Sequence, residues 1–225
     1  MRNEMMSRPV INEKVLQYLR QQPVPLSPKL RGIEEFANEK RIPIIPHETV
    51  SYLYQLVNQL RPTKILEVGT AIGFSAALFV EASQQQTRVT TIDRFEEMYQ
   101  RAQTNWQSLG YQSQIQLLTG DAADILPMLT GQYELIFLDA AKAQYINFLP
   151  EALRLLAPEG VLLIDDVLQG GTIFEPIESI RHRDKGIHRH LNQLLDTVYA
   201  DDELLTTLLP LGDGLLKITR REIQK

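Results

Sequence analysis

The sequence predicts an α/β fold of the doubly wound, Rossmann-like kind, with a mostly parallel sheet covered by helices on both faces. From Thr63 onward, short apolar runs alternate with helical stretches. The runs show no polar alternation, which is typical of strands buried on both faces. Alternating βα units of this length indicate a parallel sheet with right-handed crossovers. With 225 residues, of which 44% are hydrophobic, the chain can form a packed core.

Composition excludes several classes of protein. The absence of cysteine excludes a disulfide scaffold, a thiolate zinc site and a cysteine nucleophile. A net charge of -5 argues against a protein that coats nucleic acid over its whole surface. No run approaches the roughly 18 apolar residues of a membrane span, and the first residues show no apolar signal core. We therefore expect a cytoplasmic protein with no membrane partner.

The first sixty residues are expected to form helices. A short helix through Leu16 should end before Pro23, and a second should span Pro28 to Lys40. The apolar faces of these two helices comprise Val15, Leu16 and Leu19, and Leu30, Ile33, Phe36 and Ala37. Prolines keep residues 42–46 extended, and a third helix follows with Val50, Leu53, Tyr54, Val57 and Leu60 near period 3.6. We interpret residues 1–60 as an extension of a single domain, 1–225, whose core covers 63–220.

The apolar runs predict the strands, and the stretches between them predict helices at about 74–85, 95–109, 122–130 and 142–156. The runs are Ile65–Val68, Val89–Ile92, Ile115–Leu118, Leu135–Leu138 and Val161–Ile164. A long glycine-containing connection, 169–187, precedes a helix from about Ile187 to Val198. Two final strands, Leu204–Leu209 and Gly214–Thr219, suit a hairpin that would add an antiparallel strand at the sheet edge.

A glycine-containing loop follows the first strand. In open α/β sheets ligands bind beyond the carboxyl ends of the strands, and Gly69 and Gly73 would let the backbone turn and approach one. The loop lacks the dinucleotide pattern G-x-G-x-x-G, because Ala71 and Phe74 occupy its other glycine positions, and no P-loop lysine follows. This disfavours an NAD-dependent dehydrogenase. A plain turn is the alternative.

Single acids end the second and third strands. Asp93 stands where an acid would hold a ribose diol, and Asp121 could accept from an adenine amino group. Both could instead cap the helices that follow. Together with the glycine loop, these strand ends outline a nucleoside pocket.

The fourth and fifth strands end in Asp139 and in Asp165-Asp166. Three converging carboxylates are unfavourable unless a cation joins them, and hard oxygen ligands favour Mg²⁺ or Mn²⁺. Helix capping is the alternative for each acid. Lys142 follows three residues after Asp139. Neighbouring positive charges would favour its neutral form, so it could serve as a general base.

These motifs in combination resemble the cation-dependent class I S-adenosylmethionine (SAM) O-methyltransferases, the group of catechol and caffeoyl-CoA O-methyltransferases. The resemblance covers about Ile42 to Lys217 and rests on ILEVGTAIGFSA, TTIDR, GDA, IFLDAAKAQY and LLIDDVL. IPIIPHETVSYL, DAAKAQYINF and PLGDGLLKI resemble in particular the bacterial branch that methylates 5-hydroxyuridine at the tRNA wobble position.

The resemblance implies a role for each matching residue. Lys142 matches the catalytic lysine, and the cation ligands match Asp139, Asp165 and Asp166, where Asp166 replaces the usual Asn. That extra charge should tighten cation binding and favour Mn²⁺ or Ca²⁺ over Mg²⁺. The expected cofactor-binding residues are Ile45, Glu67, Gly69, Ser75, Asp93, Asp121, Ala122 and Asp139.

Charge patterning bears on the acceptor substrate. Residues 179–190, here called the basic segment, carry Arg181, His182, Arg183, Lys185, His188, Arg189 and His190, and the C-terminus adds Lys217, Arg220, Arg221 and Lys225. One basic patch of this kind suits phosphate contact, whereas a solvated helix face is the alternative. Stacking of Tyr145, Phe148 or Phe174 on a base is weighed against a place in the core. The sequence thus favours the anticodon region of tRNA, with a small catechol-like phenol as the alternative.

Two further expectations concern the whole molecule. The family's frequent dimers make a homodimer expected, with the N-terminal helices as its interface. A nucleotide-binding regulatory module without chemistry is the non-enzymatic alternative. The intact set of Asp139, Lys142, Asp165 and Asp166 argues against it.

Overall fold

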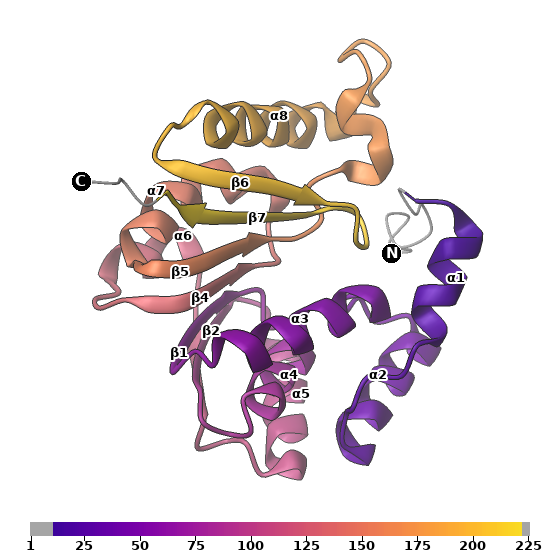
Figure 1. The fold of residues 1–225 in the computed structure, drawn as a ribbon, viewed down its shortest axis with the longest axis vertical. Coiled ribbons are helices and arrows are strands. Elements are labelled where there is room, and N and C mark those ends of the chain that lie inside the picture. Colours follow the sequence, from indigo (N-terminus) through magenta and orange to yellow (C-terminus); the bar gives the residue numbers. More distant parts are fainter. Residues whose placement is uncertain (1–10, 222–225) are drawn as a thin grey trace.

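The computed structural model describes residues 11–221, which contain a seven-stranded sheet in the order β3-β2-β1-β4-β5-β7-β6 (Figure 1). The strands are β1 (Lys64–Val68), β2 (Arg88–Asp93), β3 (Ile115–Thr119), β4 (Tyr133–Leu138), β5 (Leu156–Ile164), β6 (Leu204–Leu209) and β7 (Leu215–Arg220). Strands β1 to β5 pair in parallel. The predicted fold class is confirmed.

The terminal hairpin forms one end of the sheet. Strand β7 pairs antiparallel with β5, and β6 pairs antiparallel with β7, so the antiparallel strand lies between β5 and the outermost strand. Ile164, at the carboxyl end of β5, pairs with Leu216 near the start of β7. The turn between β6 and β7 therefore lies at the edge of the sheet where Asp165 and Asp166 follow β5.

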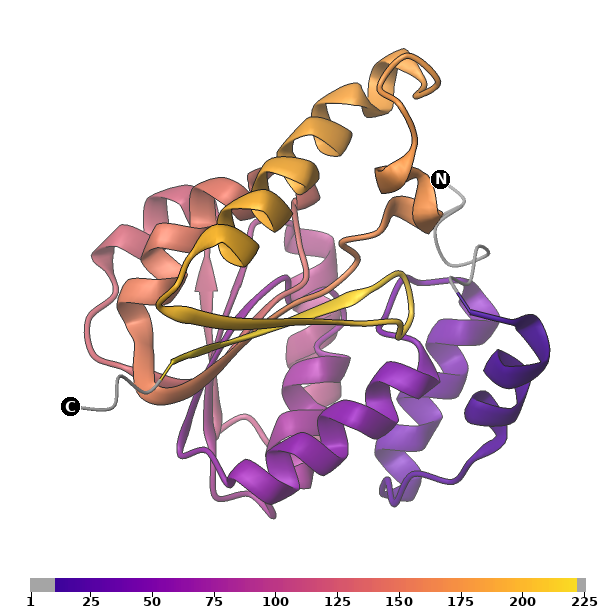
Figure 2. The ribbon, with the colours of Figure 1, turned by 45° about the horizontal axis from the view of Figure 1, so that its top comes forward.

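Helices cover both faces of the sheet (Figures 1 and 2). One core contains α2 (Pro28–Lys40), α3 (His47–Leu60), α4 (Phe74–Ala82) and α5 (Glu96–Leu109), and α1 (Glu13–Gln21) packs outside them against α3. The other core contains α6 (Ala122–Ile125), α7 (Tyr145–Leu155) and α8 (Lys185–Ala200). Strand residues alternate between the two: Ile65 faces the first core and Leu66 the second.

Local backbone geometry moves several predicted boundaries. Helix α4 ends at Ala82 instead of 85, because Gln84 and Gln85 adopt left-handed conformations with φ of 55° and 63°. The helix expected over 122–130 becomes α6 followed by the 3₁₀ turn Leu126–Met128, which contains Pro127. The helix expected from 142 begins instead as the 3₁₀ turn Lys142–Gln144.

Three residues assigned to apolar helix faces are exposed instead of buried. Val15 is 50% exposed, Phe36 is 45% exposed and Leu60, the last residue of α3, is 38% exposed, whereas Leu16, Leu30 and Ala37 are buried as expected. The helix period places a residue on a face but leaves open where the buried part of that face ends. Here α1 and α2 lie on the outside of the molecule, so only a narrow stripe of each helix is buried.

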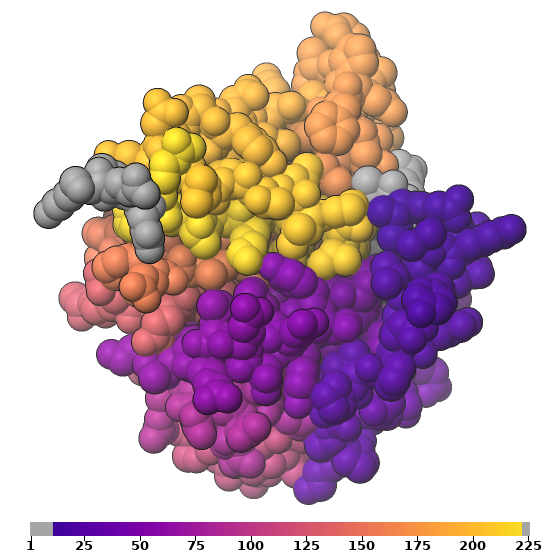
Figure 3. Space-filling model, viewed as in Figure 1, coloured from indigo at the N-terminus to yellow at the C-terminus, as the bar shows by residue number. Residues whose placement is uncertain are grey.

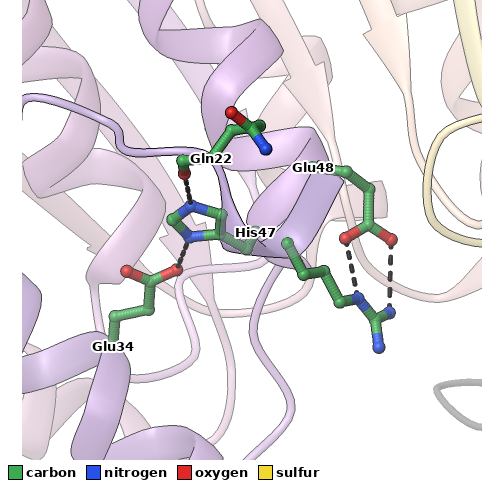
Figure 4. Close-up of polar contacts among 5 residues, drawn as sticks. Gln22, Glu34, His47 and Glu48 are labelled. Atoms are coloured by element: carbon green, nitrogen blue, oxygen red, sulfur yellow. Dashed lines mark hydrogen bonds and ion pairs between the residues drawn. The ribbon is translucent and has the colours of Figure 1, made fainter. Parts of the chain in front are cut away.

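The N-terminal helices are joined by a cluster of charged groups (Figure 4). His47, at the start of α3, places Nδ1 2.7 Å from Glu34 Oε1 of α2 and Nε2 2.8 Å from the Gln22 carbonyl oxygen after α1. Arg20 of α1 donates two hydrogen bonds, at 2.9 and 3.2 Å, to the carboxylate of Glu48. Since both partners of His47 are acceptors, the doubly protonated ring satisfies both of them.

Protonation of His47 is expected to strengthen this junction. Burial lowers the pKa of His47, but hydrogen bonds to Glu34 and Gln22 and the charges of Glu34 and Glu48 outweigh it, so the pKa is raised above its usual 6.5. The stabilisation is thus complete below about pH 6.5 and is lost as pH rises through the folded-state pKa. Thermal unfolding should show a larger Tm difference between wild type and His47→Gln at pH 5.5 than at pH 9. An equal difference at both pH values would contradict this.

The long connection before α8 forms a projecting part of the molecule. It contains the 3₁₀ turns Gln169–Phe174 and His182–Asp184. In Figure 3 this connection projects from the surface at one end of the molecule.

Of the helices in the described residues, none is long and apolar enough to cross a bilayer.

Candidate active site

The loop after β1 is held close to the end of β4. Gly69 has a φ of +104°, and a Cβ there would lie 2.4 Å from the carbonyl oxygen of Asp139. The backbone amide of Asp139 in turn donates to the Val68 carbonyl at 2.8 Å. Gly69 is therefore required for a close approach between two backbone segments, which places the glycine loop directly beside the first predicted cation ligand.

Gly73 is required for packing against α5, and its expected role in the approach of a ligand stays a prediction. With a φ of +75°, a Cβ on Gly73 would lie 2.4 Å from Trp106 Nε1 in α5. That indole donates a hydrogen bond to the Gly73 carbonyl at 2.8 Å, and Asn105 donates to the Ile72 carbonyl at 2.9 Å. The glycine spacing therefore seats α5 against the loop.

Gly73→Ala is expected to destabilise the protein more than Gly110→Ala. Gly110 has nearly the same φ, +77°, but nothing lies within 4 Å of its added Cβ. Both variants place an alanine at a strained positive φ. Gly73→Ala in addition forces the new Cβ against Trp106, which should lower the free energy of unfolding by about 1–3 kcal/mol more. Urea unfolding measures the free energy of unfolding of each. Equal losses would mean that Trp106 moves aside without cost.

Glu67 is a buried carboxylate with a free oxygen. It is fully buried on β1, and its Oε2 accepts a 2.5 Å hydrogen bond from Thr91, whose hydroxyl lies 2.7 Å from that of Thr70. Oε1 has no partner. Burial raises the pKa of Glu67 to about 7, the Asp93 charge adds to this, and the hydroxyls of Ser75 and Thr91 oppose it. Sequence reasoning missed Thr70 and Thr91.

Asp93 and Asp121 are both engaged with the chain. Asp93 accepts from the amides of Thr70 and Ala71, each at 3.0 Å, and from that of Phe95 at 2.8 Å. It thus braces the glycine loop as well as the start of α5. Asp121 caps α6 by accepting from Ala123, and it pairs with Arg94 at 2.9 Å. Asp121 thus has the capping role weighed as its alternative, whereas Asp93 holds the loop and the residue before α5 without capping that helix. Contacts of either acid to a nucleoside stay predictions.

The remaining predicted cofactor residues lie near the same loop or strand ends. Ser75 is buried in the first turn of α4, and Ala122 is buried at the start of α6. Ile45 is 4% exposed in the extended segment before α3. Pro46, the next residue, lies beside Gly212, because a Cβ on Gly212 would be 2.9 Å from its ring.

Lys142 lies within a group of carboxylates at the ends of β4 and β5. Its Nζ is 2.7 Å from Asp166 Oδ2 and 3.6 Å from Asp213 Oδ2. Asp166 has a φ of 59°, and its amide donates to Asp165 Oδ1 at 2.8 Å. Burial, followed by the neighbouring carboxylate charges, raises the pKa of both Asp139 and Asp165 well above the usual range, while Lys142 opposes this.

The described residues do not present a ready-made cation site. Among residues 11–221, no three acidic or histidine side chains form a group arranged to hold a metal ion. Asp166 instead pairs with Lys142. The donor chemistry nevertheless fits a hard cation, because Asp139 and Asp165 are desolvated carboxylates whose charges repel.

Asp213 and Tyr145 are two residues that sequence reasoning did not assign to this site. Asp213, 4% exposed, accepts a 2.5 Å hydrogen bond from the Gly170 amide, and burial raises its pKa to about 6. Tyr145 is 1% exposed, and its hydroxyl has no partner. The sequence placed Asp213 in a hairpin turn. The signal in the sequence that could have singled out Asp213 was a charged residue between two glycines.

The basic residues do not form one surface, contrary to expectation. Arg220 pairs with Leu204 at the far end of β7, whereas the basic segment adjoins the site through a 2.7 Å contact from His190 Nδ1 to the Ala143 carbonyl. Lys225 lies outside the described residues. Within the segment, Arg181 and Arg183 face Asp184 at 2.8 and 3.7 Å.

The remaining candidates for nucleic-acid contact are also divided. His188 is buried, with Nε2 3.0 Å from the Glu175 carbonyl. Of the three aromatic candidates, Tyr145 and Phe148 belong to the core, and Phe174 is 71% exposed. Part of the basic segment therefore has a structural role.

Comparisons with known proteins point to one family. The family described as O-methyltransferase matches residues 26–221. A probable caffeoyl-CoA O-methyltransferase of Dictyostelium discoideum is 29% identical over 187 residues, covering 81% of this chain and 79% of its own. A catechol O-methyltransferase of Niastella koreensis is 36% identical over 126 residues, covering 54% and 57%. The SAH-bound methyltransferase structure from Podospora anserina has a TM-score of 0.83 at 22% identity, covering 94% and 97%.

Proposed function

Because this chain belongs to the O-methyltransferase family and is a SAM-dependent enzyme, we propose that it methylates one of two adjacent oxygens on a small catechol-type phenol, with a divalent cation. The observation that carries the proposal is the placement of Lys142 among the carboxylates at the ends of β4 and β5. The same arrangement lies beside the glycine loop, where a Cβ on Gly69 would touch Asp139. Donor and acceptor sites would thus adjoin.

The cofactor SAM would lie along the loop after β1. When bound, SAM supplies an electrophilic methyl group. Glu67 is placed to bind the positively charged methionine end, since Oε1 is buried without a partner. Gly69 and Ser75 border that end, while Asp93, Asp121 and Ala122 would contact the nucleoside, and Ile45 would contact the carboxylate with its backbone.

The cation would be held by Asp139, Asp165 and Asp166. When bound, it supplies a Lewis acid that makes an acceptor hydroxyl easier to deprotonate. The raised pKa values of Asp139 and Asp165 mean that both carboxylates gain from a positive partner. The charge of Asp166 in place of an amide would strengthen this hold, with Mg²⁺, Mn²⁺ and Ca²⁺ as candidates.

Lys142 would perform the proton transfer. In its neutral form, Nζ could accept the proton of the acceptor hydroxyl. The acceptor oxygen would then take the methyl group in line, while the bond from that methyl group to the cofactor sulfur breaks and the thioether leaves. Holding the two reactants in contact supplies much of the rate acceleration. After the transfer, the negative charges of Asp166 and Asp213 would stabilise the ammonium form of Lys142, since they lie 2.7 and 3.6 Å from Nζ.

Methylation of 5-hydroxyuridine at the tRNA wobble position is the second candidate. Its 5-hydroxyl and 4-carbonyl are two adjacent oxygens, so the same site chemistry would serve. The exposed side chains of His182, Arg183 and Arg189, in the segment that adjoins the site through His190, favour it. The separation of Arg220 and Arg221 from them, and the structural contacts of His188 and His190, favour the small phenol.

A methyl-transfer assay with labelled cofactor tests the proposal. We expect transfer to a simple catechol that is lost with EDTA and restored by excess Mg²⁺ or Mn²⁺. EDTA-sensitive transfer to tRNA bearing 5-hydroxyuridine, with none to catechol, would replace the phenol by the wobble base. Transfer that ignores EDTA would refute the role of the three aspartates. The homodimer stays a prediction for size-exclusion chromatography.

A further inference from the structure

The turn between β6 and β7 connects three parts of the candidate active site. Gly212 packs against Pro46 and Thr49 at the start of α3. The carbonyl of Asp213 accepts from the Leu168 amide at 2.8 Å, and its side chain accepts from Gly170. A side chain on Gly214 would lie 2.4 Å from Leu168, so this turn is tightly fitted to the chain that follows Asp166.

Within this turn, Asp213 directs one oxygen at Lys142. Its Oδ1 is committed to Gly170, whereas Oδ2 is buried without a hydrogen-bond partner, 3.6 Å from Lys142 Nζ. The side chain of Asp213 is 3% exposed. A buried carboxylate oxygen without a hydrogen bond is unfavourable unless a positive charge lies near it. Lys142 is the cation in that position.

Asp166, the other partner of Lys142, cannot pair with the lysine and bind a cation at the same time. Its side chain is 25% exposed, and it is one of the three acids expected to hold a cation. Once Asp166 turns toward a cation, Asp213 is the carboxylate that stays beside Lys142. Unlike Asp166, it is fixed by the backbone bonds of Gly170 and Leu168.

We propose that Asp213 is a positioning residue that holds Lys142 at the acceptor oxygen and ties it to the loop 168–174. The inference rests on the proposed function for its catalytic consequence. The geometry of the turn is independent of that function. Removing the charge of Asp213 should leave Lys142 free to leave its reactive position.

The test compares Asp213→Asn with wild type and with Asp202→Asn, an exposed aspartate in the turn before β6. Asparagine keeps an oxygen for Gly170 and a similar volume, but it loses the charge that faces Lys142. We expect kcat to fall about 10- to 100-fold, with the KM for catechol, the Kd for SAM and the Tm unchanged. Wild-type kcat in Asp213→Asn would overturn the proposal, and so would a fall in kcat that is explained by lost cofactor binding or a lower Tm.

A second measurement does not depend on turnover. Acetic anhydride labelling at pH 8 with Mg²⁺, followed by peptide mapping, reports the reactivity of Lys142. We expect faster acetylation of Lys142 in Asp213→Asn than in wild type, with Lys64 as an internal reference. Equal rates would overturn the proposal even if neither acceptor is methylated. Absence of wild-type turnover with a changed labelling rate would instead refute the proposed function and leave the contact standing.

Discussion

Replacing Lys142 by methionine is expected to lower kcat about 10²- to 10⁴-fold while the Kd for SAM stays unchanged. This is the range by which a general base accelerates a reaction. Methionine matches the length of the lysine side chain but cannot accept a proton or pair with Asp166 and Asp213, which lie 2.7 and 3.6 Å away. Steady-state kinetics with catechol and cofactor titration measure the two quantities.

The control for this variant is Lys64→Met. Lys64 is exposed at the start of β1, at the opposite edge of the sheet from the site. The control removes one surface charge and should keep wild-type turnover. If Lys142→Met keeps most of its activity, the acceptor must lose its proton to another group, and the assignment of Lys142 as base is wrong.

Replacing Glu67 by glutamine is expected to weaken cofactor binding about 10- to 100-fold. A buried, charge-assisted contact contributes about 1.5–3 kcal/mol, which is this range in Kd. Because burial raises the pKa of Glu67 to about 7, the carboxylate is only partly ionised in the free protein at neutral pH. Wild-type affinity for SAM should therefore increase between pH 6 and pH 8, and Glu67→Gln should abolish that increase.

Glu96→Gln, at an exposed position in the first turn of α5, is the matched control and should bind SAM as wild type does. Calorimetric titration at three pH values gives the affinities. A pH dependence that persists in Glu67→Gln would place the titrating group elsewhere.

The same substitution should stabilise the cofactor-free protein at alkaline pH. Because folding raises the pKa of Glu67 from 4.5 to about 7, the folded protein is more stable when Glu67 is protonated. Ionisation of Glu67 therefore lowers the free energy of unfolding as pH rises through 7. At pH 8 this cost is about 3 kcal/mol. A higher Tm for Glu67→Gln than for wild type, at pH 8 and not at pH 5, is the expected result. Binding and stability would then change in opposite directions.

The order and type of the central elements could be predicted from the sequence. Short apolar runs predict strands buried on both faces, and this holds for residues such as Ile65 and Leu66 of β1. It is wrong for β3, which lies at the edge of the sheet and leaves Gln116 exposed. The acids that follow these runs, Asp93, Asp139 and Asp165, then lie at one edge of the sheet because parallel strands share their direction.

The tertiary structure decided what those residues contact. The sequence placed Gly73 in a loop, but it did not show that the missing Cβ makes room for Trp106, which is 33 residues away. The basic residues looked like one patch, until the direction of β7 carried Arg220 away from the basic segment. Asp213 came to Lys142 because an antiparallel strand returns the hairpin turn to the carboxyl edge. Periodicity describes each element along the chain, whereas such contacts depend on how distant elements pack, which the local pattern does not contain.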